Sequence, residues 1–103
     1  MRPKDSEQWY VISAAARIVG VHAQTLRYYE RVGMIRPSRS RGNQRLYSVD
    51  DLERLRQIKT LVNDLGVNLA GVEVILRLTQ RIAEMERKVR ESEAGPETLN
   101  DNP

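Results

Sequence analysis

Residues 22–31 place four polar side chains at the spacing of one helix face. These side chains, at i, i+3, i+4 and i+7, belong to Gln24, Arg27, Tyr28 and Arg31. An amide, two guanidinium groups and a phenol on one face can donate to base edges and to phosphate oxygens. Leu26, Tyr29 and Val32 fall on a different stripe, which is suited to packing against a neighbouring element. The stretch is typical of a helix that reads a nucleic-acid groove.

The distribution of charge favours this interpretation over an ordinary solvated helix face. Residues 1–47 contain nine Lys+Arg and three Asp+Glu, a balance of +6, whereas residues 48–103 have a balance of −3. A basic half suggests a polyanionic partner. Arginine dominates that half, and its planar guanidinium suits bidentate recognition of phosphates and guanines.

A short helix should precede this stretch. Ser13 is a plausible N-cap, three alanines follow it, and Gly20 is a natural stop, so we expect a helix over residues 13–19. Val21 and His22 then link it to the second helix, which Gly33 ends. Two short helices joined by a tight turn that contains glycine form a helix-turn-helix.

After the second helix, the pattern predicts a β-hairpin wing. Its two short strands are residues 35–37 and 45–47, and a basic loop joins them. Gly42 and Asn43 tolerate the positive φ that the turn needs, and Pro37 must lie at a strand end or on an edge. The alternative is a flexible basic loop.

Two further helices follow the wing. Ser48, followed by Asp50 and Asp51, resembles a capped helix start. Apolar residues then recur at helical spacing up to Gly66, and they are Leu52, Leu55, Ile58, Val62 and Leu65. Asn68 can cap a fourth helix.

The fourth helix carries an apolar seam with the 3, 4, 3, 4 spacing of a coiled coil. The seam residues are Ile75, Leu78, Ile82, Met85 and Val89. We interpret residues 75–92 as a dimerisation helix, although two heptads are short and the helix could instead fold back on its own core. Residues 1–8 are expected to be flexible, and residues 93–103, with Gly95 and Pro96, are expected to form a disordered tail.

Composition excludes several classes of function. The 103 residues contain no cysteine and one histidine, so we expect no metal site and no cofactor. We find no nucleophile–base pair and no phosphate-binding glycine loop, so an enzyme is not expected. No apolar run approaches the length of a membrane span and no signal peptide is evident, so a cytoplasmic protein is the default.

Several separate segments resemble the MerR-type winged-helix regulators. The segments are residues 11–16 (VISAAA), 25–30 (TLRYYE), 33–35 (GMI), 45–48 (RLYS) and 50–52 (DDL). Residues 10–13 (YVIS), 22–27 (HAQTLR) and 66–73 (GVNLAGVE) resemble the heat-shock repressor branch in particular. The resemblance covers about residues 9–78. It implies a mainly α fold, in which a winged helix-turn-helix DNA-binding domain (residues 9–74) is followed by a helical coiled-coil dimerisation segment.

The resemblance also implies a function. A homodimer would bind double-stranded DNA at inverted-repeat operators upstream of chaperone genes and repress them, with a DnaK-type chaperone as co-repressor. The chain departs from the larger family in having no ligand-binding domain after the coiled coil and no sensing cysteines. We therefore expect no small-molecule effector and a signal that arrives through another protein.

Both lines of reasoning give a set of candidate DNA contacts. The side chains expected to enter the groove are those of Gln24, Thr25, Arg27 and Tyr28. Arg27 could either make a bidentate contact with a guanine edge or bind a phosphate. His22 could instead have a structural role in the turn, and Tyr47 could belong to the core. The full set is Ser13, Ala14, His22, Gln24, Thr25, Arg27, Tyr28, Arg31, Arg39, Arg41, Asn43, Arg45 and Tyr47.

Other functions remain open at this point. A MerR-type activator that distorts its promoter is the second interpretation, and the position of the operator would discriminate between the two. An excisionase-like DNA-bending factor and an adaptor that binds only protein come next. Salt-dependent DNA binding would exclude the adaptor.

Overall fold

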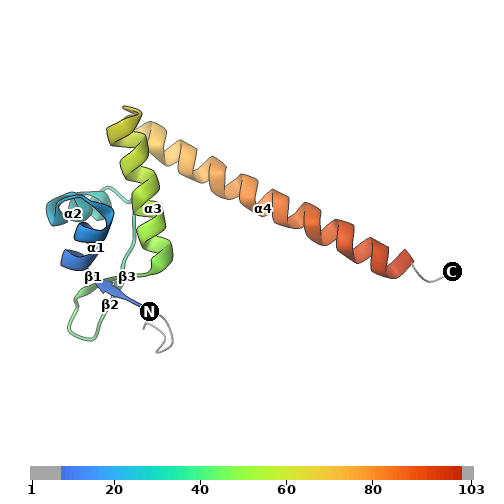
Figure 1. The fold of residues 1–103 in the computed structure, drawn as a ribbon, viewed down its shortest axis with the longest axis horizontal. Coiled ribbons are helices and arrows are strands. Elements are labelled where there is room, and N and C mark those ends of the chain that lie inside the picture. Colours follow the sequence, from blue (N-terminus) through green and yellow to red (C-terminus); the bar gives the residue numbers. More distant parts are fainter. Residues whose placement is uncertain (1–7, 101–103) are drawn as a thin grey trace. The chain divides into compact units, whose positions relative to one another are not determined.

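The computed structural model describes residues 8–100, and their side chains as far as residue 93. The chain divides into two compact units, one up to Val67 and one from Asn68 onward. The first unit contains a helix-turn-helix, a three-stranded sheet and a third helix, and the second consists of one long helix (Figure 1). The expected boundary at residue 74 therefore falls inside that last helix. Residues 1–7 of the expected flexible N-terminus lie outside the described residues.

The helix-turn-helix comprises α1 (Ile12–Val19) and α2 (Ala23–Arg31). Gly20 ends α1 as predicted, since it adopts the left-handed conformation at φ +86° and its N–H donates to the Ala16 carbonyl at 2.8 Å. Ser13 is not the N-cap. The helix begins one residue earlier, at Ile12, so Val11 occupies the cap position without a side-chain bond.

The sheet is antiparallel and has the order β1-β3-β2, with β1 at Tyr10–Val11, β2 at Ser38–Arg39 and β3 at Arg45–Tyr47. The strand predicted at 35–37 is wrong, because Pro37 has no N–H to donate to a ladder and Ile35 is buried in the core. The predicted strand at 45–47 is confirmed. The two-residue β1 was not predicted.

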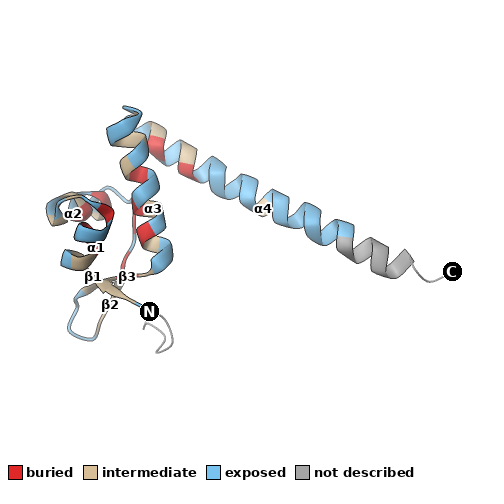
Figure 2. Ribbon diagram, in the orientation of Figure 1, coloured by how far each residue is buried: buried red, intermediate tan, exposed pale blue. Residues whose placement is uncertain are grey.

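The core of the first unit lies between α1, α2 and α3, where Figure 2 shows the buried residues. Leu26 and Tyr29 of α2 are buried there, as their stripe predicted. Val32 is 42% exposed instead, because α2 ends at Arg31 and the chain leaves the helical path.

The third helix, α3 (Val49–Lys59), begins with the predicted serine cap. The Ser48 hydroxyl accepts from the Asp51 N–H at 3.0 Å, and the Asp51 carboxylate accepts from the Ser48 N–H at 2.9 Å. Leu52, Leu55 and Ile58 are buried. The backbone then widens into a π-helical turn, η1 (Thr60–Asp64). Apolar periodicity does not distinguish such a turn from an α-helix, and Leu65 beyond it is exposed.

The second unit is α4 (Leu69–Asn100). Asn68 caps it as predicted, since its side-chain oxygen accepts from the Gly71 N–H at 2.8 Å. The bounds of α4 extend past Gly95 and Pro96 to Asn100, whereas the sequence predicted a disordered tail from residue 93. Residues 101–103 lie outside the described part.

Candidate nucleic-acid interface

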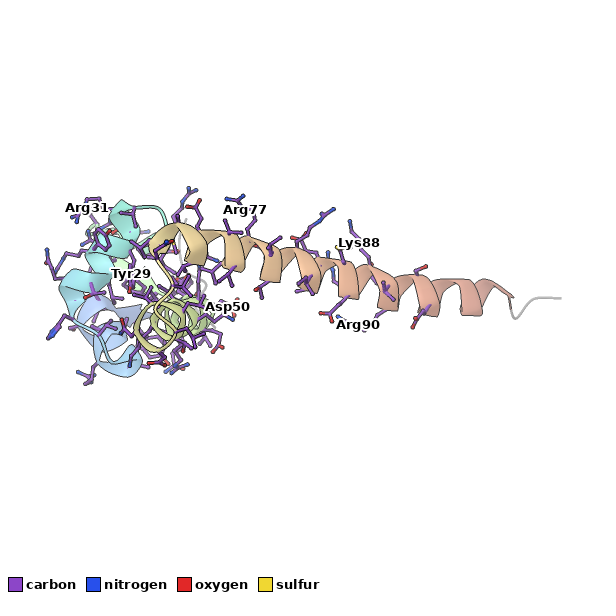
Figure 3. The ribbon with its side chains drawn as sticks, turned by 90° about the horizontal axis from the view of Figure 1, so that it is seen from above. Tyr29, Arg31, Asp50, Arg77, Lys88 and Arg90 are labelled. Atoms are coloured by element: carbon purple, nitrogen blue, oxygen red, sulfur yellow. The ribbon has the colours of Figure 1, made fainter. Side chains whose placement is uncertain are left out.

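The outer face of α2 carries the four polar side chains that the spacing predicted, and all four are exposed. Arg27 donates through Nη1 to the side-chain oxygen of Gln24 at 3.3 Å. The Arg31 guanidinium lies over the Tyr28 ring, with its central carbon 5.3 Å from the ring centroid. Figure 3 shows Arg31 on the outside of the unit and Tyr29 turned toward its interior. The face thus presents two preorganised pairs.

These pairs leave hydrogen-bonding edges free for a ligand. A guanidinium stacked on a phenol still offers its N–H groups at the edge of its plane, and a singly bonded arginine keeps further donors. Amide and guanidinium side chains are the groups that make bidentate contacts with adenine and guanine in the major groove. The face is therefore chemically equipped to read base edges.

The wing is an ordered hairpin and not a flexible loop. Its turn is closed by the Asn43 N–H donating to the Ser40 carbonyl at 2.9 Å and by the Ser40 N–H donating to the Gln44 carbonyl at 2.9 Å. Asn43 takes the predicted left-handed conformation at φ +63°. Arg41 is exposed at the tip, where it can reach a phosphate.

A shallow hollow brings α2 and the wing together. Its lining residues are Gln24, Arg27, Glu30, Arg31, Arg39 and Arg45. Glu30 accepts from Arg39 Nη2 at 2.8 Å and from Arg45 Nε at 2.6 Å, one arginine on each carboxylate oxygen. Burial raises the pKa of Glu30, but the hydrogen bonds and charges of Arg45 and Arg39 outweigh this and hold it below its ordinary value. Glu30 is therefore a carboxylate at neutral pH.

Tyr47 is not a surface residue, so its assignment as a DNA contact is wrong. Its side chain is completely buried. Burial, and secondarily the charge of Glu30, raise the pKa of its phenol. Arg45 and Tyr47 are two residues apart on β3 and therefore share a face of the sheet. Tyr47 is buried in the core, whereas Arg45 is half-buried and bonded to Glu30 of α2.

The remaining candidates lie at the starts of the two short helices. Ser13 is exposed and Ala14 half-buried in the first turn of α1, where backbone N–H groups point outward. His22 is exposed just before α2, and its carbonyl accepts from the Thr25 N–H at 2.9 Å. His22 thus has a role in the turn through its backbone, and its imidazole is accessible.

Sequence reasoning missed the role of Glu30 and two cations of α3. Arg54 donates to the Met34 carbonyl at 2.8 Å, and Lys59 donates to the Val19 carbonyl at 3.2 Å. Glu30 had a usable signal, because it is one of three acids in the basic half and lies within the reading helix. Nothing in the pattern indicated which carbonyls Arg54 and Lys59 would reach.

A helix-turn-helix with an arginine-bearing wing beside its second helix defines a winged-helix DNA-binding fold. Residues 10–79 match the family described as MerR HTH family regulatory protein. The chain therefore belongs to the MerR family of HTH regulatory proteins.

Individual relatives agree with this membership. A Streptomyces coelicolor protein that carries the name heat shock protein HspR is 46% identical over 82 residues, which are 80% of this chain and 54% of that protein. The HTH-type transcriptional regulator GlnR of Bacillus anthracis is 33% identical over 73% of this chain and 57% of its own length. The chain therefore spans little more than half the length of these relatives.

Solved structures show the same fold. A MerR family regulator from Bacillus cereus is 28% identical with a TM-score of 0.64, over 90% of this chain and 76% of that one. HiNmlR, a MerR family regulator that lacks the sensor domain and was solved on promoter DNA, has a TM-score of 0.63 at 20% identity, over 91% of this chain and 77% of that one.

The residues that the structure describes contain neither a membrane-spanning helix nor a metal-binding cluster. Within residues 8–100, no helix is long and apolar enough to cross a membrane. In the same part of the chain, no cluster of three His, Cys, Asp or Glu side chains could hold a metal ion.

Proposed function

We propose that this regulator is a heat-shock repressor, which binds inverted-repeat operators of chaperone genes as a homodimer. The observation that carries the proposal is the surface on which the exposed face of α2 and the arginines of the wing border one hollow. The 46% identity to the HspR-named protein supports the choice of target genes. Mapping the genomic DNA that copurifies with the protein tests this choice, and a lack of enrichment at chaperone operons would contradict it.

The proposal assigns base reading to side chains of α2 and phosphate binding to the wing. Gln24 and Arg27 lie side by side on the reading face, whereas Arg41 is at the tip of the wing. Arg41→Ala should weaken operator and random-sequence DNA alike. Gln24→Ala should weaken the operator by about 1–3 kcal/mol more than random DNA. An unchanged ratio of the two affinities in Gln24→Ala would refute the assignment of base reading.

The proposed dimer forms along the apolar seam of α4. Leu78, Ile82, Met85 and Val89 are each 52–56% exposed, and Ile75 is half-buried. A line of large apolar side chains on one face of a long helix is typical of an uncovered interface. A twofold dimer presents two copies of α2, which fits a palindromic operator with half-sites about 34–36 Å apart.

A matched pair of α4 variants tests the seam. Ile82→Glu introduces a charge within it, whereas Ala83→Glu adds the same charge at the neighbouring exposed position outside it. In sedimentation experiments, only Ile82→Glu should shift the species from twice the 11.9 kDa chain mass toward the single chain. A dimeric Ile82→Glu variant with normal operator binding would contradict the proposal.

A DnaK-type chaperone is the proposed co-repressor. This step rests on the resemblance to the heat-shock repressor branch and on the HspR-named relative. Adding the purified chaperone should raise the operator affinity of the wild-type protein, and an unfolded client protein should reverse the gain. The proposal fails if the chaperone leaves operator binding unchanged. Activation of a chaperone promoter in a purified transcription system would instead favour a MerR-type activator.

A further inference from the structure

The strands of the wing place two arginines directly opposite each other. Arg39 of β2 pairs with Arg45 of β3 in the register of the sheet. Like charges at directly opposed positions destabilise a strand pair. The two strands have only two and three residues, and so short a hairpin has little stability of its own. The wing therefore needs a contact that neutralises this pair.

Glu30 supplies that contact from the reading helix. Its two oxygens each accept from one guanidinium, at 2.8 Å from Arg39 and 2.6 Å from Arg45. Arg39 also donates through Nη1 to the Asn43 carbonyl at 3.3 Å, which extends the connection into the turn. Among the salt bridges of the described residues, only those of Glu30 join a helix to the wing.

We propose that Glu30 is a positioning residue for DNA recognition, which holds the wing on α2 and keeps Arg39 and Arg45 from binding phosphates of arbitrary sequence. This inference rests on the proposed DNA binding and adds a specificity-determining residue to it. Glu30 makes the wing and the reading face one body, so both can engage DNA only in one relative placement.

The location of Glu30 explains why this arrangement favours specificity over affinity. A carboxylate in the hollow between α2 and the wing lies among the groups that face phosphate, and its charge repels DNA. It also occupies donors of Arg39 and Arg45 that could otherwise neutralise phosphates. Phosphate neutralisation carries affinity but no sequence information. Glu30 thus lowers the sequence-independent part of binding.

The first test uses the free protein and needs no DNA. Glu30→Gln keeps the shape of the side chain and removes its charge. Glu53→Gln is the control, because Glu53 is an exposed carboxylate paired with Arg56 on α3, away from the wing. Amide hydrogen exchange of Ser40, Asn43 and Gln44 should accelerate about three- to tenfold in Glu30→Gln alone, as expected for losing a partly exposed charge-assisted pair. Unchanged exchange at these amides would overturn the proposal.

The second test measures binding to a random-sequence 30-bp duplex and to a duplex selected from a random library by the wild-type protein. In Glu30→Gln, the log–log salt slope on random DNA should steepen by about 0.9 for each arginine that moves to a phosphate. Random-sequence affinity should rise, and the ratio of selected to random affinity should fall. A merely structural contact predicts the opposite pattern, in which affinity for both duplexes drops and the slope stays constant.

The outcomes distinguish this inference from the proposed function. If the wild-type protein binds no DNA, the proposed function fails, while the exchange test still decides whether Glu30 positions the wing. If Glu30→Gln does not fold, Glu30→Asp retains the charge but is one methylene shorter, so it cannot hold both arginines at the same distances. Glu30→Asp should then accelerate the same wing amides, and wild-type exchange in it would refute the proposal.

Discussion

Gly20, between the two helices of the helix-turn-helix, is the position where one added methyl group should have the clearest structural effect. Its φ is +86°, and a Cβ built there would lie 2.9 Å from Lys59 Nζ. The same ammonium group donates to the Val19 carbonyl at 3.2 Å. Gly33, after α2, has nearly the same φ of +83° but no atom within 4 Å of its Cβ position. Gly33→Ala is therefore a matched control for Gly20→Ala.

The two substitutions share one cost and differ in another. In the left-handed conformation, a residue with a Cβ destabilises the folded state by about 1–2 kcal/mol. Alanine also lowers the entropy of the unfolded chain, which offsets about 0.4–1 kcal/mol of this loss. Gly33→Ala should thus lower the free energy of unfolding by about 1 kcal/mol. Gly20→Ala should lower it by about 1 kcal/mol more, because the ammonium group has to move and its hydrogen bond to Val19 weakens.

Chemical denaturation of five proteins, the four of a Gly20–Lys59 double-mutant cycle and the Gly33→Ala control, isolates the contribution of Lys59. In a Lys59→Met background, Gly20→Ala should cost no more than Gly33→Ala does, because Met lacks the terminal ammonium group. The double-mutant cycle should give a coupling energy of about 1 kcal/mol. A coupling energy near zero, or equal effects of Gly20→Ala and Gly33→Ala in the wild-type background, would refute this account of the turn.

Three further predictions concern single groups. Tyr47→Phe should leave DNA affinity unchanged in a binding titration, because the phenol is completely buried. The lowered pKa of Glu30 means that its contribution to wing stability is complete above its ordinary value of 4.5 and is lost as the pH falls through the lower folded value. The protection factors of the wing amides, that is their exchange rates relative to the unstructured chain at the same pH, should therefore fall only in acid. Ser48→Ala should lower the free energy of unfolding by about 0.5–2 kcal/mol in thermal or chemical denaturation, since it removes the cap of α3.

The parts of the fold that the sequence predicted are those with local causes. Gly20, Ser48 and Asn68 mark helix ends through their own backbone or side-chain chemistry, and all three act as expected. The errors occur where the local structure is determined by a residue far away in the sequence. The strand β1 exists only because Tyr10 pairs with Tyr47, 37 positions along the chain, and two residues carry no pattern of their own.

The candidate site shows the same division. The exposed face of α2 follows from helical spacing alone, so Gln24, Arg27 and their neighbours were found without a structure. The burial of Tyr47 depends on which face of β3 meets the core, and a three-residue strand does not reveal that from its own sequence. The sequence marks Glu30 as a rare acid in the basic half, but its two arginine partners follow only from the wing lying beside α2.

Polar contacts from α3 supplement the apolar core around the helix-turn-helix. Arg54 and Lys59 donate to two backbone carbonyls, that of Met34 just after α2 and that of Val19 at the end of α1. The carbonyls at a helix end lack partners within the helix, and those at its C-terminus attract cations. Through these bonds, α3 contacts the C-terminal end of α1 and the chain just after the C-terminal end of α2. These two hydrogen bonds add to the apolar contacts of Leu55 and Ile58 in holding α3 against the helix-turn-helix and the chain that follows it.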